Sequence, residues 1–194
     1  MITLHIDTLK LKNEQTGTID EEVTSIGAIH LFQPQKECIF KPQKEFYEEL
    51  RVQGKGEHDA RNPNRKHPEK AIKEFSAWLQ DIPDKTSVGF AVNQHLDSLK
   101  VLSSRYNSPV FNLMTSLELK EVCYIIMSVN ASEIPNIITL DKIIEYAGLA
   151  KAPNPCNSLE QARLESEVMS RLLYGNSLYK TYTQEQFPVP EYLV

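Results

Sequence analysis

The sequence predicts an α/β domain in which a mixed β-sheet, an antiparallel meander followed by parallel strands, is flanked by helices. Two patterns support this prediction. Residues 1–50 are rich in β-branched positions with strand-like alternation, whereas apolar residues after position 67 recur mostly at helical spacing. The length of 194 residues suits a single domain with elaborations.

The first part of the chain is expected to form the meander. Apolar residues alternate along the N-terminal segment, which ends at the acid Asp7. The polar residues 10–22 predict a turn before the next strand. The expected extended segments are residues 1–7, 23–32 and 37–40, with residues 46–50 as a further extended piece.

The second part is expected to be mainly helical. Pro68 is typical of the first helical position, where its missing N–H costs nothing. Gly148 and Gly175 are expected to end helices in the left-handed conformation. The expected helices cover residues 68–82, 96–106, 117–129, 140–147 and 158–174, with a short strand at 88–92 and a further one near 110–114.

Composition limits the class of protein. Hydrophobic residues make up 41% and charged residues 24%, as in an ordinary globular protein. No apolar run approaches the roughly 20 residues of a membrane span, and the N-terminus has no secretory pattern, so no membrane partner is expected. Cys38, Cys123 and Cys156 are odd in number and widely spaced, which favours free thiols in a cytoplasmic protein.

The charge is unevenly distributed. The net charge of −5 argues against a protein that holds duplex nucleic acid by electrostatics alone. Residues 51–73, however, hold seven Lys or Arg against three acids, a local charge of +4. This segment is either a solvated loop or a loop that contacts phosphates, and the candidate nucleic-acid ligands are then Arg61, Arg65 and Lys66.

Several segments, taken in order, resemble the DEDDh-type 3′–5′ exonucleases of the ribonuclease-H-like superfamily. The resemblance implies a ribonuclease-H-like sheet in a single exonuclease-like domain over residues 1–175. It leaves residues 176–194 as an aromatic tail, which packs on the domain or on the second subunit of a homodimer. The segments are Ile6-Asp7, SIGAI at 25–29, HPEKAIKEFSAWL at 67–79, Asn93 to Asp97, TLDKIIEYAGL at 139–149 and CNSLEQARLESEVMSRLL at 156–173.

The resemblance also implies a two-metal site. Such enzymes hold two Mg²⁺ or Mn²⁺ ions about 4 Å apart on converging carboxylates. The family pattern is Asp-x-Glu on the first strand, a middle Asp, and His-x(4)-Asp at the last helix. The first and middle acids match Asp7 and Asp97, the catalytic and metal-binding candidates. Leu9, Cys156 and Gln161 occupy the other three positions, so two carboxylates and the general base are lost.

Each candidate has an alternative interpretation. The segment from Glu14 to Gly17 echoes the family's Glu-Thr-x-Gly, so Glu14 is an alternative metal ligand on a loop. Asp7 could instead be a strand-end acid that caps a turn, and Asp97 an acid favoured by the helix dipole. His95, near the same helix start, is a replacement base or a capping residue.

Three functions remain open at this point. The first is a catalytically impaired exonuclease-like protein that binds nucleic acid or a protein partner. The second is an active, Mg²⁺- or Mn²⁺-dependent 3′–5′ exonuclease on single-stranded DNA or RNA that uses Asp7 and Asp97. The third is a different enzyme, or a scaffold, on the same fold.

Overall fold

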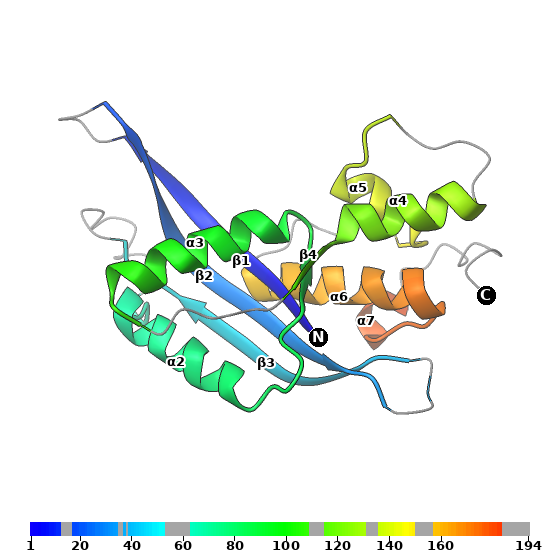
Figure 1. Cartoon of the computed structure of the whole chain (residues 1–194), viewed down its shortest axis with the longest axis horizontal. Coiled ribbons are helices and arrows are strands. Elements are labelled where there is room, and N and C mark those ends of the chain that lie inside the picture. The colour runs from blue at the N-terminus through cyan, green and yellow to red at the C-terminus, as the bar shows by residue number, and fades with distance from the viewer. Residues whose placement is uncertain are drawn as a thin grey trace.

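The computed structural model describes residues 1–12, 17–34, 37, 39–52, 63–108, 115–130, 136–149 and 157–183. Within these residues, five strands form one sheet in the order β3-β2-β1-β4-β5 (Figure 1). β2 is antiparallel to both β1 and β3, and β4 and β5 run parallel to β1. The strands are β1 Ile2–Lys12, β2 Ile19–Phe32, β3 Lys41–Glu49, β4 Ser87–Gly89 and β5 Ser116–Glu118.

Helices cover both faces of this sheet. Helices α2 and α3 lie on one face, and α6 lies on the other with α4 and α5 beside it (Figure 1). The expected mixed α/β sheet flanked by helices is therefore confirmed. The helices are α2 Pro68–Gln80, α3 Val92–Arg105, α4 Leu119–Asn130, α5 Leu140–Tyr146, α6 Ser158–Tyr174 and α7 Lys180–Thr183.

The β1–β2 hairpin is longer than the sequence predicts. The turn expected over residues 10–22 is wrong at both ends, because β1 runs on to Lys12 and β2 begins at Ile19. Pairing continues because each polar position lies opposite a partner across the ribbon, and strand formation depends on such partners more than on intrinsic propensity. A bulge between Asp7 and Thr8 shifts the register of the outer part.

The third strand lies later than predicted. The strand expected at residues 37–40 is wrong, and β3 is Lys41–Glu49, whose second half lies in the extended piece expected at residues 46–50. This strand is at the edge of the sheet, where Pro42 is tolerated because an edge residue has no obligatory N–H partner. The sequence of β3 is largely polar, which suits an exposed edge strand. For the same reason, a search for alternating apolar residues does not detect the start of this strand.

The helix ends follow their local signals. His67 caps α2, Asn157 caps α6 by accepting from the N–H of Glu160, and Gly175 ends α6 at φ 66°. The helix expected from residue 117 begins at Leu119, because Ser116–Glu118 pair with β4 as β5. The further strand expected near residues 110–114 lies outside the described residues.

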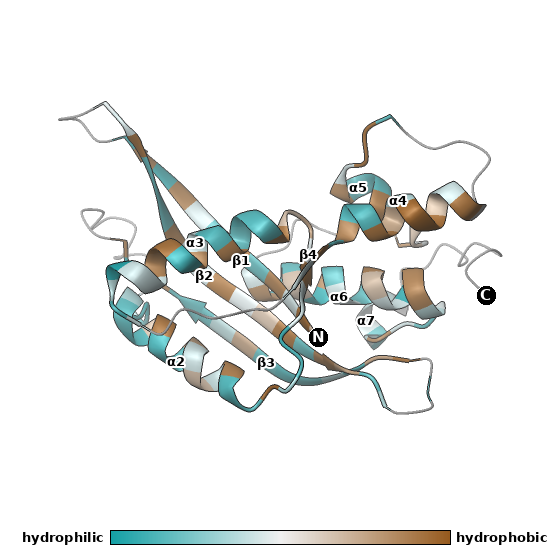
Figure 2. Ribbon diagram, in the orientation of Figure 1, coloured by the Kyte–Doolittle hydropathy of each residue, from teal (hydrophilic) through white to brown (hydrophobic). Residues whose placement is uncertain are grey.

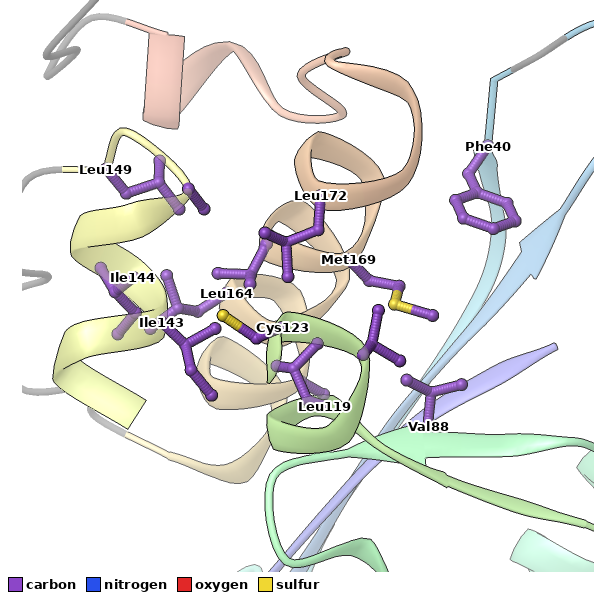
Figure 3. Close-up of a cluster of buried hydrophobic side chains, with 14 of the residues drawn as sticks. Phe40, Val88, Leu119, Cys123, Ile143, Ile144, Leu149, Leu164, Met169 and Leu172 are labelled. Atoms are coloured by element: carbon purple, nitrogen blue, oxygen red, sulfur yellow. The ribbon is translucent and has the colours of Figure 1, made fainter. Parts of the chain in front are cut away.

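Because side chains along a strand point alternately to the two faces of the sheet, the domain has one hydrophobic core on each face. Figure 2 shows hydrophobic and hydrophilic residues alternating along β1 and β2. Ile2, Leu4 and Ile6 point into the cluster made with α2 and α3. The second cluster lies between the opposite face and helices α4, α5 and α6, where Leu119, Cys123, Ile143, Leu164 and Met169 point toward one another (Figure 3).

The described part of the predicted tail folds onto its own domain. Leu178, Tyr179 and Tyr182 pack against the second cluster. The backbone N–H groups of Leu178 and Tyr179 donate to Glu167 at 2.6 and 3.1 Å. Residues 184–194 lie outside the described residues. None of the helices in the described part of the chain has the length and apolar composition needed to cross a bilayer.

Candidate functional site

A cluster of polar side chains lies beyond the point where the pairing of β1 with β4 ends. Among the described residues, the two strands pair at Ile2 and Thr3 and β4 ends at Gly89, so β1 has no strand partner on this side beyond Thr3. A Cβ at Gly89 would lie 2.8 Å from Glu165 Oε2 and 2.8 Å from the Leu4 carbonyl oxygen. Only glycine allows the chain to turn so closely past both groups, which brings the start of α3 and the middle of α6 together.

Glu165 on α6 is the centre of the cluster. Its side chain is fully buried and both carboxylate oxygens are hydrogen-bonded. Oε1 lies 3.1 Å from His5 Nδ1 and accepts from Gln161 Nε2 at 3.0 Å. Oε2 accepts from the N–H of Phe90 at 3.1 Å. A buried carboxylate is tolerated in a protein when it is paired and hydrogen-bonded in this way.

His5 connects Glu165 to Asp7. Its Nε2 lies 3.5 Å from Asp7 Oδ1, and Ser25 donates to Asp7 Oδ2 at 2.5 Å. Ser25 Oγ also lies 2.9 Å from the Ser158 hydroxyl at the start of α6. The imidazole of His5 therefore lies between two carboxylates, that of Asp7 on the sheet and that of Glu165 on α6.

The charges of this cluster follow from its geometry. Burial disfavours the imidazolium form of His5, but hydrogen bonds to Asp7 and Glu165 and the charges of both outweigh it and raise the pKa of His5 to about 9. Burial opposes ionisation of Asp7, yet hydrogen bonds from His5 and Ser25 lower its pKa. His5 is thus an imidazolium at neutral pH and neutralises part of the carboxylate charge.

His95 on α3 completes the cluster as a neutral ring. Its centroid lies 4.6 Å from that of His5. Burial, followed by the positive charge of His5, lowers the pKa of His95. Two adjacent histidines are therefore held in opposite protonation states, one cationic and one neutral.

The structure brings together some of the residues predicted for the site and separates others. Asp7 and Gln161 both lie in the cluster. Asp97 does not: its carboxylate is 71% exposed and pairs with Lys100 at 2.8 Å. Asp97 follows His95 by two helical positions, a rotation of roughly 200°, so it points away when His95 faces inward. Leu9 lies beyond the bulge, opposite Glu22 in the hairpin.

Other predicted residues lie elsewhere or outside the described part of the chain. Glu14, Cys156 and Arg61 are among the residues that the structure does not describe. Arg65 pairs with Glu49 at 3.1 Å, and Lys66 pairs with both Glu48 and Glu74, so these two cations are engaged within the protein. 

Sequence reasoning missed His5 and Glu165. His5 precedes Asp7 by two positions, so the two side chains share one face of β1. Glu165 follows Gln161 by one helical turn and shares its face of α6. These spacings are visible in the sequence, but they put Leu9 on the same face of β1 as well. The contacts of His5 with Glu165 and Asp7, together with the bulge before Thr8, make His5 and Asp7 the first-strand pair beside the last helix.

The donor set does not fit a pair of hard divalent ions. Such ions require several carboxylate oxygens that converge and are free to coordinate. Here both oxygens of Glu165 already accept hydrogen bonds, and the imidazolium of His5 lies between Glu165 and Asp7. Among the described residues, no group of three His, Cys, Asp or Glu side chains has an arrangement that could hold a metal ion.

Comparison with known proteins adds no relative to this picture. A scan against models of protein families finds none that matches the chain, and a search of curated proteins finds no match either. The site is therefore interpreted from its own residues and their geometry.

The protonation of His5 predicts a pH dependence of stability. The pKa of His5 is raised from 6.5 to about 9 by folding, so its contribution is complete below pH 6.5 and is lost as the pH rises through about 9. We expect the free energy of unfolding to fall by roughly 3 kcal/mol across this window. Urea unfolding at a series of pH values measures it, and His5→Gln should flatten the profile. An unchanged slope in that variant would contradict the assignment.

Proposed function

We propose that this chain is a divergent member of the DEDDh-type exonuclease branch of the ribonuclease-H-like superfamily that does not hydrolyse nucleic acid and acts by binding a protein partner. The observation that carries the proposal is the position of His5. Its imidazolium provides, between Asp7 and Glu165, the positive charge that a divalent ion would otherwise supply. The negative charges of Asp7 and Glu165 are thus compensated without a metal ion.

The fold supports the superfamily part of the proposal. An antiparallel β1–β2–β3 meander continues through the parallel strands β4 and β5 in the order β3-β2-β1-β4-β5. This is the layout that the resemblance implies. The polar cluster, moreover, is formed by the first strand, the segment after the middle strand and the last long helix, which are the three elements expected to contribute metal ligands in that family.

Charge favours a protein over a nucleic acid as the partner. Affinity for phosphates depends on Lys and Arg side chains that are free to replace counterions. Arg65 and Lys66, two of the predicted phosphate ligands, instead form ion pairs with acids of β3 and α2. The active alternative, a divalent-metal exonuclease that uses Asp7 and Asp97, requires the exposed carboxylate of Asp97 to turn toward the cluster.

The proposal is tested by metal binding and by nuclease assays. We expect no saturable Mn²⁺ binding by calorimetry, and no trimming of single-stranded DNA or RNA from the 3′ end in Mg²⁺ or Mn²⁺. The variant His5→Asp removes the internal cation and adds a carboxylate beside Asp7 and Glu165, so it should bind Mn²⁺ and gain thermal stability with increasing Mn²⁺.

A matched control separates this effect from added surface charge. His67→Asp places the same change at the exposed cap of α2 and should bind no Mn²⁺. Metal-dependent trimming by the unchanged protein, abolished in Asp97→Ala and in Asp7→Asn, would overturn the proposal in favour of the active exonuclease.

A further inference from the structure

A groove of about 720 Å³ lies between the β1–β2 hairpin and α3. Both walls are long elements, and the hairpin projects beyond the helices that cover the sheet (Figure 1). His95 of the polar cluster lines one part of the groove, so the groove adjoins the candidate site. Its lining residues are Ile6, Thr8, Ile19, Asp20, Glu21, Glu22, Val23, Gln94, His95, Asp97, Ser98, Val101, Leu102 and Arg105.

The groove presents apolar side chains to solvent. Ile6, Val23 and Leu102 are buried and form its base. Ile19 on the hairpin and Val101 on α3 are 69% and 58% exposed, one on each wall. Exposed aliphatic residues that face each other across a hollow are typical of a surface that another chain covers.

Acids surround these apolar residues. Arg105 is bound to Glu22 at 2.5 and 2.7 Å, so its charge is already neutralised. Within the described residues, Asp20 and Glu21 form no ion pair, although Glu21 accepts a hydrogen bond from the Thr8 hydroxyl and lies opposite Lys10 in the strand register. The groove therefore combines an apolar base with a lining of four acids and one arginine, a net negative charge that repels phosphates and attracts Lys and Arg.

The geometry points to a partner of defined chemistry. We propose that the groove binds an amphipathic helix of another protein, with aliphatic side chains on one face and Lys or Arg beside them. The aliphatic face would cover Ile19 and Val101, and the cations would lie against Asp20 and Glu21. This inference rests on the proposed function in one respect, that the protein acts by binding a protein partner. It adds the surface that binds and the chemistry of the partner.

Fluorescence anisotropy with model peptides tests this groove. The probe is a short labelled Leu/Lys peptide with helical amphipathic spacing, and the same peptide with Glu in place of Lys is its control. The Leu/Lys peptide should bind and the Leu/Glu peptide should not. The double variant Asp20→Lys/Glu21→Lys should weaken binding roughly fivefold or more, and Val101→Ser roughly threefold or more.

Matched variants locate the binding surface. Val129→Ser and Glu145→Lys change an exposed valine on α4 and an exposed acid on α5, away from the groove, and should leave affinity unchanged. Equal weakening by these variants, or no binding of the Leu/Lys peptide, would overturn the proposal. Binding of a labelled single-stranded oligonucleotide in its place would assign the protein to nucleic acid. The nuclease and Mn²⁺ measurements are independent of all these outcomes.

Discussion

Replacing Gly27 with alanine is expected to lower the free energy of unfolding by about 3 kcal/mol or more. A Cβ at this position would lie 2.2 Å from the Ser158 carbonyl carbon, 2.3 Å from its oxygen and 2.4 Å from the nitrogen of Leu159. All three atoms belong to backbone, so no side chain can rotate to make room. The first turn of α6 would have to move away from β2.

The displacement would also disturb the polar cluster. Ser158 lies beside Ser25, which holds Asp7, and the same helix carries Glu165. Urea unfolding of Gly27→Ala should therefore show both lower stability and a smaller pH dependence from His5. Gly17→Ala is the control, because nothing lies within 4 Å of its Cβ and its φ of 71° costs only about 1 kcal/mol. Equal stability of the two variants would show that the close approach is absent.

Replacing Arg171 with methionine is expected to cost about 3–5 kcal/mol, because it leaves the carboxylate of Glu167 buried without a counter-charge. Both side chains are fully buried, and Arg171 Nε donates to Glu167 Oε1 at 2.7 Å. Arg171 Nη1 also reaches the carbonyl oxygen of Gly148 at 3.3 Å. The arginine thus joins α6 to the end of α5.

The same substitution should loosen the segment after α6. Glu167 accepts hydrogen bonds from the hydroxyl of Ser177 and the N–H of Leu178, both at 2.6 Å. Hydrogen exchange at Leu178 should therefore accelerate together with the fall in the denaturation midpoint. Arg163→Met, on the same helix but with its ion pairs at the surface, should cost less than about 1 kcal/mol. Equal losses would contradict the special role of the buried pair.

Much of the fold could be predicted because its signals are local. Pro68 and Gly175 mark helix ends through backbone geometry that depends only on their own chemistry. The apolar alternation of β1 likewise needs no partner to be recognised. The beginning of β3 was missed because an edge strand needs little apolar sequence, and its position depends on pairing with β2.

The candidate site was predictable only in part. Asp7 and Gln161 were identified as family positions, and both lie in the cluster. His5 and Glu165 were missed because neither stands at a position of the family pattern, which directed attention to residues 7, 9, 97, 156 and 161. The exposure of Asp97 depends on the rotation of α3 about its axis, which packing of its buried residues determines.

Sequence alone thus specified the α/β class and most helix boundaries, because each depends on residue type and short-range spacing. Tertiary structure decided which side chains meet. Residues 5 and 165 are 160 positions apart, and their contact exists because β2 has no side chain at Gly27 and the turn after β4 has none at Gly89. These two close approaches bring α6 near enough for Glu165 to reach His5 across the sheet-helix interface.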